Sequence, residues 1–160
     1  MNKPTQFLAL AALALGLSAC ATAPAPAPLA DTLGRDPQLS TFNRLVDQAG
    51  LRDSLRASGP LTVFAPSDEA FKAVPAKTLE ALAQDNAQLK AVLSYHILSS
   101  QLSAAEIKPG NVKTLQGANV ALSKAGDFVT VEDAMVQRSD IKATNGVAHV
   151  IDRVLMPPKK

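Results

Sequence analysis

Apolar positions in the first half of the chain follow helical spacing, with one strand pattern between them. One helix face is traced over residues 39–49, and Gly50 follows it where helices commonly end. A second, short helix is predicted over residues 51–55. The apolar run at residues 61–64 then predicts a buried strand, which Pro66 ends.

Further helices are predicted before the middle of the chain. Ser67 or Asp68 can cap the helix that follows the strand. Pro75 suits the first turn of another helix, which is predicted to run through Leu79 and Leu82. An amphipathic helix is predicted from Asn86 to Leu98. The first half is therefore expected to be rich in helix.

The second half changes to short apolar stretches divided by turn residues. Asn145-Gly146 is the strongest hairpin signal, because both residue types accept positive φ. The apolar run at residues 147–155 predicts a long final strand with both faces covered. A helix-rich half that precedes a strand-rich half predicts an α+β domain.

The N-terminal segment has the order of a secretory signal. Lys3 precedes an apolar core at residues 7–17, and Leu17-Ser18-Ala19-Cys20 places small residues directly before the sole cysteine. This pattern predicts a signal peptide over residues 1–19 and lipidation of Cys20. Alternating proline and alanine then predict a semi-rigid spacer over residues 20–32, with the folded domain at residues 33–160. The expected location is the bacterial cell envelope, with the outer membrane favoured because Ala21 rather than an acidic residue follows Cys20.

Composition argues against several function classes. The formal net charge is only +2, and no block of like charges is present, so no nucleic-acid partner is expected. His96 and His149 are the only histidines, and no metal-ligand spacing, nucleophile elbow or phosphate loop accompanies them. We therefore expect no metal, no cofactor and no enzymatic activity.

Three motifs in order resemble those of fasciclin domains, over residues 36–157. They are Leu-Thr-Val-Phe-Ala-Pro-Ser-Asp-Glu-Ala-Phe at residues 61–71, Val-Leu-Ser-Tyr-His-Ile-Leu at 92–98 and Asn-Gly-Val-Ala-His-Val-Ile-Asp-Arg-Val-Leu at 145–155. The resemblance implies a wedge-shaped β-sandwich of about seven strands with several helices packed along one edge. The motif residues expected to determine the fold are Thr62, Phe64, Pro66, Ser67, Asp68, Phe71, Asn145, Gly146, His149, Val150 and Ile151.

Tyr95 and His96 are the candidate partner-binding residues. The corresponding Tyr-His region is associated with integrin binding in animal fasciclin domains, so the resemblance implies a binding role at this position. Adjacent helical residues diverge by about 100°, so both side chains cannot point to the centre of the core. The competing interpretation is structural, with the tyrosine ring packed at a helix edge and the histidine in an internal hydrogen bond.

The leading functional prediction is a lipid-anchored, non-catalytic envelope module that binds a macromolecule in adhesion or surface organisation. An alternative is a periplasmic protein that binds a small apolar ligand between its helices and sheet. A hydrolase ranks last, because it requires a serine within reach of His96 or His149. An enclosed apolar cavity would favour the alternative, and an exposed patch over a filled core would favour adhesion.

Overall fold

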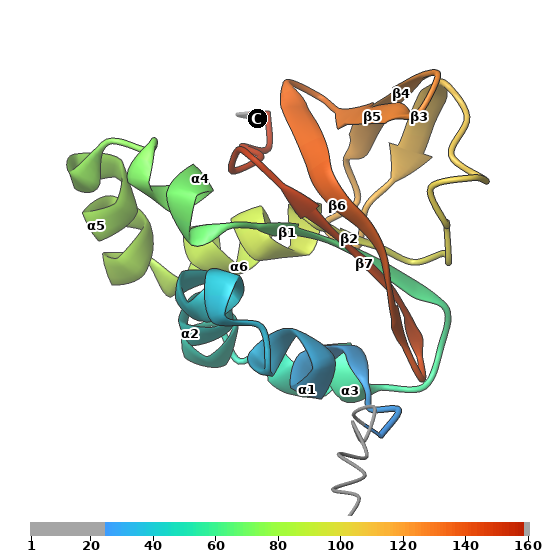
Figure 1. Cartoon of the computed structure of the whole chain (residues 1–160). Helices are drawn as coiled ribbons and strands as arrows, with labels where there is room; N and C mark the ends of the chain where they lie inside the picture. Colours follow the sequence, from blue (N-terminus) through green and yellow to red (C-terminus); the bar gives the residue numbers. More distant parts are fainter. Residues whose placement is uncertain (1–24, 159–160) are drawn as a thin grey trace, which may run out of the picture.

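The computed structural model describes residues 25–158 (Figure 1). Cys20 and the predicted signal peptide lie outside these residues. Within them, no helix combines the length and the hydropathy that a membrane crossing requires.

Helices dominate the first part of the described chain, as predicted (Figure 1). Side-chain caps fix where two of them begin, since Ser67 accepts from the backbone N–H of Ala70 and Asp85 accepts from those of Ala87 and Gln88. A 3₁₀ turn at Pro37–Leu39 precedes α2. The α-helices are α1 (Leu29–Gly34), α2 (Ser40–Gln48), α3 (Arg52–Arg56), α4 (Asp68–Lys72), α5 (Ala76–Gln84) and α6 (Asn86–Tyr95).

Seven strands form one continuous order, β2-β1-β7-β6-β5-β4-β3. They are β1 (Leu61–Pro66), β2 (Ile97–Leu98), β3 (Gly110–Lys113), β4 (Asn119–Ala125), β5 (Phe128–Val131), β6 (Ala134–Ala143) and β7 (Gly146–Ile151). Only β1 and β7 pair in parallel. A single bridge between Leu98 and Thr114 brings the two ends of the sheet together, so the sheet is nearly closed. The predicted α+β class is confirmed.

Two apolar clusters make up the core. The first lies between the helices and the central strands, and it includes Leu33, Phe42 and Leu93 with Val63 and Val150. The second lies inside the folded sheet; its members include Phe64, Tyr95, Leu122, Val131 and Ile151. Strands β1 and β7 contribute to both clusters because both of their faces are covered, and this explains their continuous apolar sequence.

Three predicted boundaries differ from the structure. The final strand, expected over residues 147–155, ends at Ile151. The helix expected to reach Leu98 ends at Tyr95, because Ile97 and Leu98 leave it to pair with β1 as β2. The packed domain also begins before the expected Leu33, since Leu29 is fully buried in the helical core as part of α1.

The turn at Asn145-Gly146 also differs from the prediction. Neither residue has positive φ, and Gly146 already pairs with Ala143 as the first residue of β7. Glycine is needed there for space, since a Cβ would lie 2.0 Å from the backbone oxygen of Leu61. The Asn145 side chain joins three segments: its oxygen accepts from the N–H of Leu29, and its NH₂ donates to the carbonyls of Leu55 and Ala57.

Candidate functional site

The two outer sequence motifs lie side by side in the centre of the sheet. β1 and β7 run in parallel, with Phe64 opposite His149, Ala65 opposite Val150 and Pro66 opposite Ile151. The rings of Phe64 and His149 stack with their centroids 5.5 Å apart. These motif residues are buried, so they support the fold rather than form an exposed surface.

Tyr95, at the end of α6, is also buried, with only 2% of its surface exposed. Its hydroxyl lies 3.0 Å from the carbonyl oxygen of Asn119 and 3.1 Å from the Glu132 carboxylate. Burial, followed by the negative charge of Glu132, raises the pKa of Tyr95 to about 12. The hydroxyl therefore stays protonated and joins α6 to the strands.

Glu132 is the member of this group that the sequence did not indicate. The acidic pair Glu132-Asp133 resembles an ordinary charged loop, but Glu132 has φ of 53° between β5 and β6. In this position its carboxylate accepts both from Tyr95 and from the backbone N–H of Ala121. Positive φ on a non-glycine residue is uncommon, and the two hydrogen bonds stabilise it here.

His96 is fully buried and neutral. Its Nε2 accepts from the N–H of Leu155, so the proton lies on Nδ1, which donates to the carbonyl oxygen of Val92 at 2.8 Å. Its own carbonyl accepts from the N–H of Phe64. Burial lowers the pKa of His96 to about 4, although the hydrogen bond to Val92 opposes this shift. His96 thus connects α6, β1 and the C-terminal segment.

His149 and Thr62 hold the loop that follows β2. His149 Nε2 lies 2.9 Å from the carbonyl of Leu102, and its Nδ1 accepts from the N–H of Asp140. The Thr62 hydroxyl donates to the carbonyl of Ser100 and accepts from the N–H of Leu102. Burial lowers the pKa of His149 as well. Three of these four hydrogen bonds go to backbone groups of the loop and the fourth goes to the backbone of β6, so the two side chains hold the loop against the sheet.

Ser67 and Asp68 have different roles, although the sequence offered both as caps. Ser67 caps α4, whereas the Asp68 carboxylate accepts from the Ser40 hydroxyl and the Thr41 N–H at the start of α2. Burial raises the pKa of Asp68, but these hydrogen bonds outweigh burial and lower it overall. Phe71 is buried in the helical core, as expected.

Exposed residues of β4, β5 and β6 form a surface next to this group. Phe128 is 67% exposed and Met135 45%. Thr130 lies opposite Met135 on β6 and Ser123 on β4, and Ala121 is exposed two residues before Ser123. These five residues, which we call the outer strand face, carry no charge. They lie next to the Tyr95–Glu132 contact through Ala121.

The chemistry available to the described residues is limited. Every hydrogen bond of the two imidazoles within residues 25–158 is made to backbone, and none involves a serine or threonine hydroxyl. The same residues contain no group of three or more His, Cys, Asp or Glu side chains that could hold a metal ion.

The family model of the fasciclin domain matches residues 37–157. The chain belongs to the fasciclin-domain family. The match spans all three motifs, from the helices that precede β1 to the segment after β7. The predicted family is confirmed, and fasciclin domains are generally non-catalytic modules of the adhesion type.

Fasciclin-domain relatives occur in bacteria and animals. Protein sll1483 of Synechocystis is 40% identical over 121 residues, which cover 74% of this chain and 67% of that protein. Immunogenic protein MPB70 of Mycobacterium bovis is 36% identical, with 81% of this chain and 69% of that protein covered. Human periostin is 34% identical over 81% of this chain, which corresponds to only 16% of periostin.

A solved structure shares the fold. The domain pair of the insect cell adhesion molecule Fasciclin I superposes with a TM-score of 0.69 over 82% of this chain and 51% of that chain, at 18% identity. This likeness confirms the fasciclin fold. Tyr95 and His96 are both buried, and direct contact with a partner requires exposed atoms. Their role as partner-binding residues therefore stays a prediction.

Proposed function

We propose that this fasciclin domain is a lipid-anchored binding module of the bacterial cell envelope, which contacts a macromolecule in adhesion or surface organisation. Its membership of a family of adhesion-type modules carries this proposal. The described residues add the uncharged outer strand face, and buried histidines whose hydrogen bonds go to backbone groups. No catalytic step is part of the proposal.

Anchoring rests on the N-terminal sequence. Small residues precede Cys20 directly, and a proline-alanine spacer follows it. A related protein from Mycobacterium bovis, 35% identical over 81% of this chain, is named cell surface glycolipoprotein MPB83. Two or more acyl chains give durable membrane binding where one chain is marginal. We place the protein at the outer membrane, facing the periplasm or the cell surface.

Replacement of Cys20 tests the anchor. Cys20→Ser should abolish labelling by a radioactive or clickable fatty acid, and it should leave either released protein or an unprocessed precursor. Ser18→Thr, which keeps a small residue before the cysteine, is the matched control and should retain the label. Lipid labelling that persists in Cys20→Ser would contradict the anchoring proposal.

We further propose that the outer strand face contacts the partner. The described chain begins beside α1 and α3, whereas β3, β4 and β5 lie at the opposite end of the molecule (Figure 1). In a domain tethered through its N-terminus, these strands would therefore lie at the end far from the membrane. Tyr95 acts as a positioning residue in this proposal, because it contacts Glu132 and the carbonyl of Asn119 at the start of β4. His96 also acts as a positioning residue, because it joins α6 to β1 and to the C-terminal segment.

Cell attachment measures this binding. Phe128→Ser removes the largest exposed side chain of the outer strand face and should weaken attachment of cells to their surface or to one another. Because residue 128 is exposed, the melting temperature should change little. Lys90→Ser, at an exposed position of α6, is the control. Unchanged attachment in Phe128→Ser would remove the outer strand face as the binding site.

A further inference from the structure

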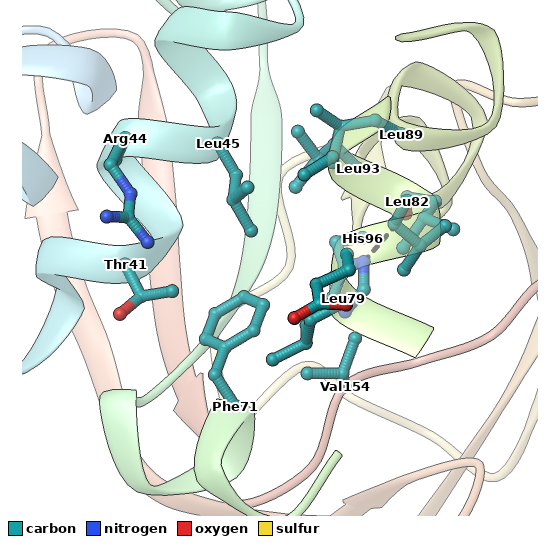
Figure 2. A pocket seen from close by; sticks show the side chains of 13 residues that line it. Thr41, Arg44, Leu45, Phe71, Leu79, Leu82, Leu89, Leu93, His96 and Val154 are labelled. Atoms are coloured by element: carbon teal, nitrogen blue, oxygen red, sulfur yellow. Dashed lines mark hydrogen bonds between the residues drawn. The ribbon is translucent and has the colours of Figure 1, made fainter. Parts of the chain in front are cut away.

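An apolar pocket of about 210 Å³ lies among α2, α4, α5 and α6. Figure 2 shows leucine side chains from three helices directed toward the same space, with the Phe71 ring at one side. Leu45 comes from α2, Leu79 and Leu82 from α5, and Leu93 from α6. The alternative prediction of an apolar ligand site placed it between helices and sheet, whereas this pocket is formed mainly by helices.

Helix α5 forms a loosely packed wall of the pocket. None of its residues is buried, although Leu79 and Leu82 line the pocket. A second hollow, lined by Leu82, Val92 and Met156 among others, lies against the same helix. Protein interiors have few voids larger than a water molecule, so an apolar pocket beside a helix with no buried residue is unusual. Elements that admit ligands tend to come from such weakly held parts of a fold.

The most buried polar side chain of the pocket lining has no free nitrogen to offer a ligand. His96 is the polar side chain at the inner end of the pocket, and both imidazole nitrogens are already hydrogen-bonded to Val92 and Leu155. Polar side chains occur instead among the more exposed lining residues: Thr41, Arg44 and Glu80. Neither Arg44 nor Glu80 makes an ion pair with another residue in the described part of the chain.

We propose that the pocket binds the alkyl chain of a single-chain amphiphile, with its polar head at the mouth. An apolar cavity of about 150 Å³ is enough to bind benzene, so the volume here suits a short alkyl chain or the end of a longer one. The mainly apolar lining disfavours a polar tail group, since such a group would lose its hydrogen bonds to water. Arg44 and Glu80 carry opposite charges, so together they add no net charge to the pocket mouth. This favours an uncharged, hydrogen-bonding head such as a hydroxyl.

Photocrosslinking tests the site on the purified full-length protein. The probe is a ten-carbon alcohol with a diazirine in the chain, and mass spectrometry locates the labelled residues. Unlabelled alcohols from butanol to octanol then compete for the site. The concentration of alcohol that halves the labelling should fall about fourfold for each methylene added to its chain, until the pocket is filled. This factor corresponds to about 0.8 kcal/mol per methylene.

Variants of α5 separate pocket binding from general surface labelling. Leu82→Trp should fill the pocket and abolish labelling, whereas Lys77→Trp, at an exposed position of the same helix outside the pocket lining, should retain it. Circular dichroism checks that both variants fold. If Leu82→Trp does not fold, Ala83→Leu adds smaller bulk to the same wall and should weaken labelling.

The proposal predicts labels on α2, α5 or α6 residues that line the pocket. Labels concentrated on exposed apolar side chains such as Phe128 would overturn it. Unchanged labelling in a folded Leu82→Trp variant would do the same, and so would competition that does not depend on chain length.

Discussion

Protonation of His96 should make the protein less stable in mild acid. The imidazole is fully buried, and both of its nitrogens are hydrogen-bonded to backbone groups. A second proton would remove the acceptor for the Leu155 N–H and place a charge in the core. The folded state therefore resists protonation, and the pKa of His96 falls from 6.5 to about 4.

The size and the sign of the change in stability with pH follow from proton linkage. Between these two pKa values the unfolded chain binds one more proton than the folded chain, so stability falls as the pH falls. The stabilisation is fully present above pH 6.5, and about 2 kcal/mol of it should be lost by pH 5. The pKa of His149 is also lowered, so this residue contributes in the same direction. The lowered pKa values of Asp31, Asp68 and Glu106 affect stability mainly below this window, as their ordinary values are 3.8 and 4.5.

Urea unfolding at pH 8, 7, 6 and 5 measures the effect in the wild type and in His96→Gln. The glutamine amide supplies one donor and one acceptor but does not titrate in this range. The wild type should lose about 2 kcal/mol more than His96→Gln between pH 8 and pH 5. Lys90→Gln, an exposed change on the same helix, should behave as the wild type does. Equal losses in the wild type and in His96→Gln would refute the assignment of His96 as a buried neutral group.

Three further predictions concern the contacts that organise the fold. Gly146→Val should lower the free energy of unfolding, measured thermally or in urea, by more than about 3 kcal/mol, because a Cβ would overlap the β1 backbone, whereas Gly126→Ala should lower it by only about 1 kcal/mol, since no atom lies near the added Cβ. Equal losses in the two variants would contradict the steric explanation. Asn145→Asp keeps one acceptor and loses two donated hydrogen bonds, so it should destabilise by about 2 kcal/mol in urea, and a neutral effect would show that these bonds contribute nothing. Tyr95 is the single tyrosine, so ultraviolet absorbance reports its pKa alone, and this pKa should fall from about 12 in Glu132→Gln because a negative neighbour is removed. An unchanged pKa would show that burial alone raises it.

Local sequence signals predicted the parts of the fold that depend on nearby residues. The helix over residues 39–49 and its end at Gly50 were correct, since Gly50 has φ of 68° as a helix terminus requires. Ser67 was correctly offered as a cap. The three motifs also gave the correct family. In the structure they meet: β1 pairs with β7, and His96 is hydrogen-bonded to Phe64 and to Leu155.

Features that depend on distant residues were missed. Ile97 and Leu98 continue the apolar pattern of α6, and only pairing with β1 makes them a strand. Gly146 has the residue type of a hairpin turn, but the close approach of Leu61 explains it. The contact of Glu132 with Tyr95 crosses 37 positions of sequence, so no local pattern indicates it. Leu29 is buried although the sequence around it resembles a spacer.

Photocrosslinking in the native envelope tests the proposed function most directly. A photoreactive amino acid is placed at position 128 of the outer strand face, and at position 90 on α6 as a control. A discrete macromolecular adduct is expected from position 128; it should be absent from position 90 and reduced in Cys20→Ser. The same adducts from both positions, or no adduct from position 128 in protein that is folded and anchored, would contradict the proposed function.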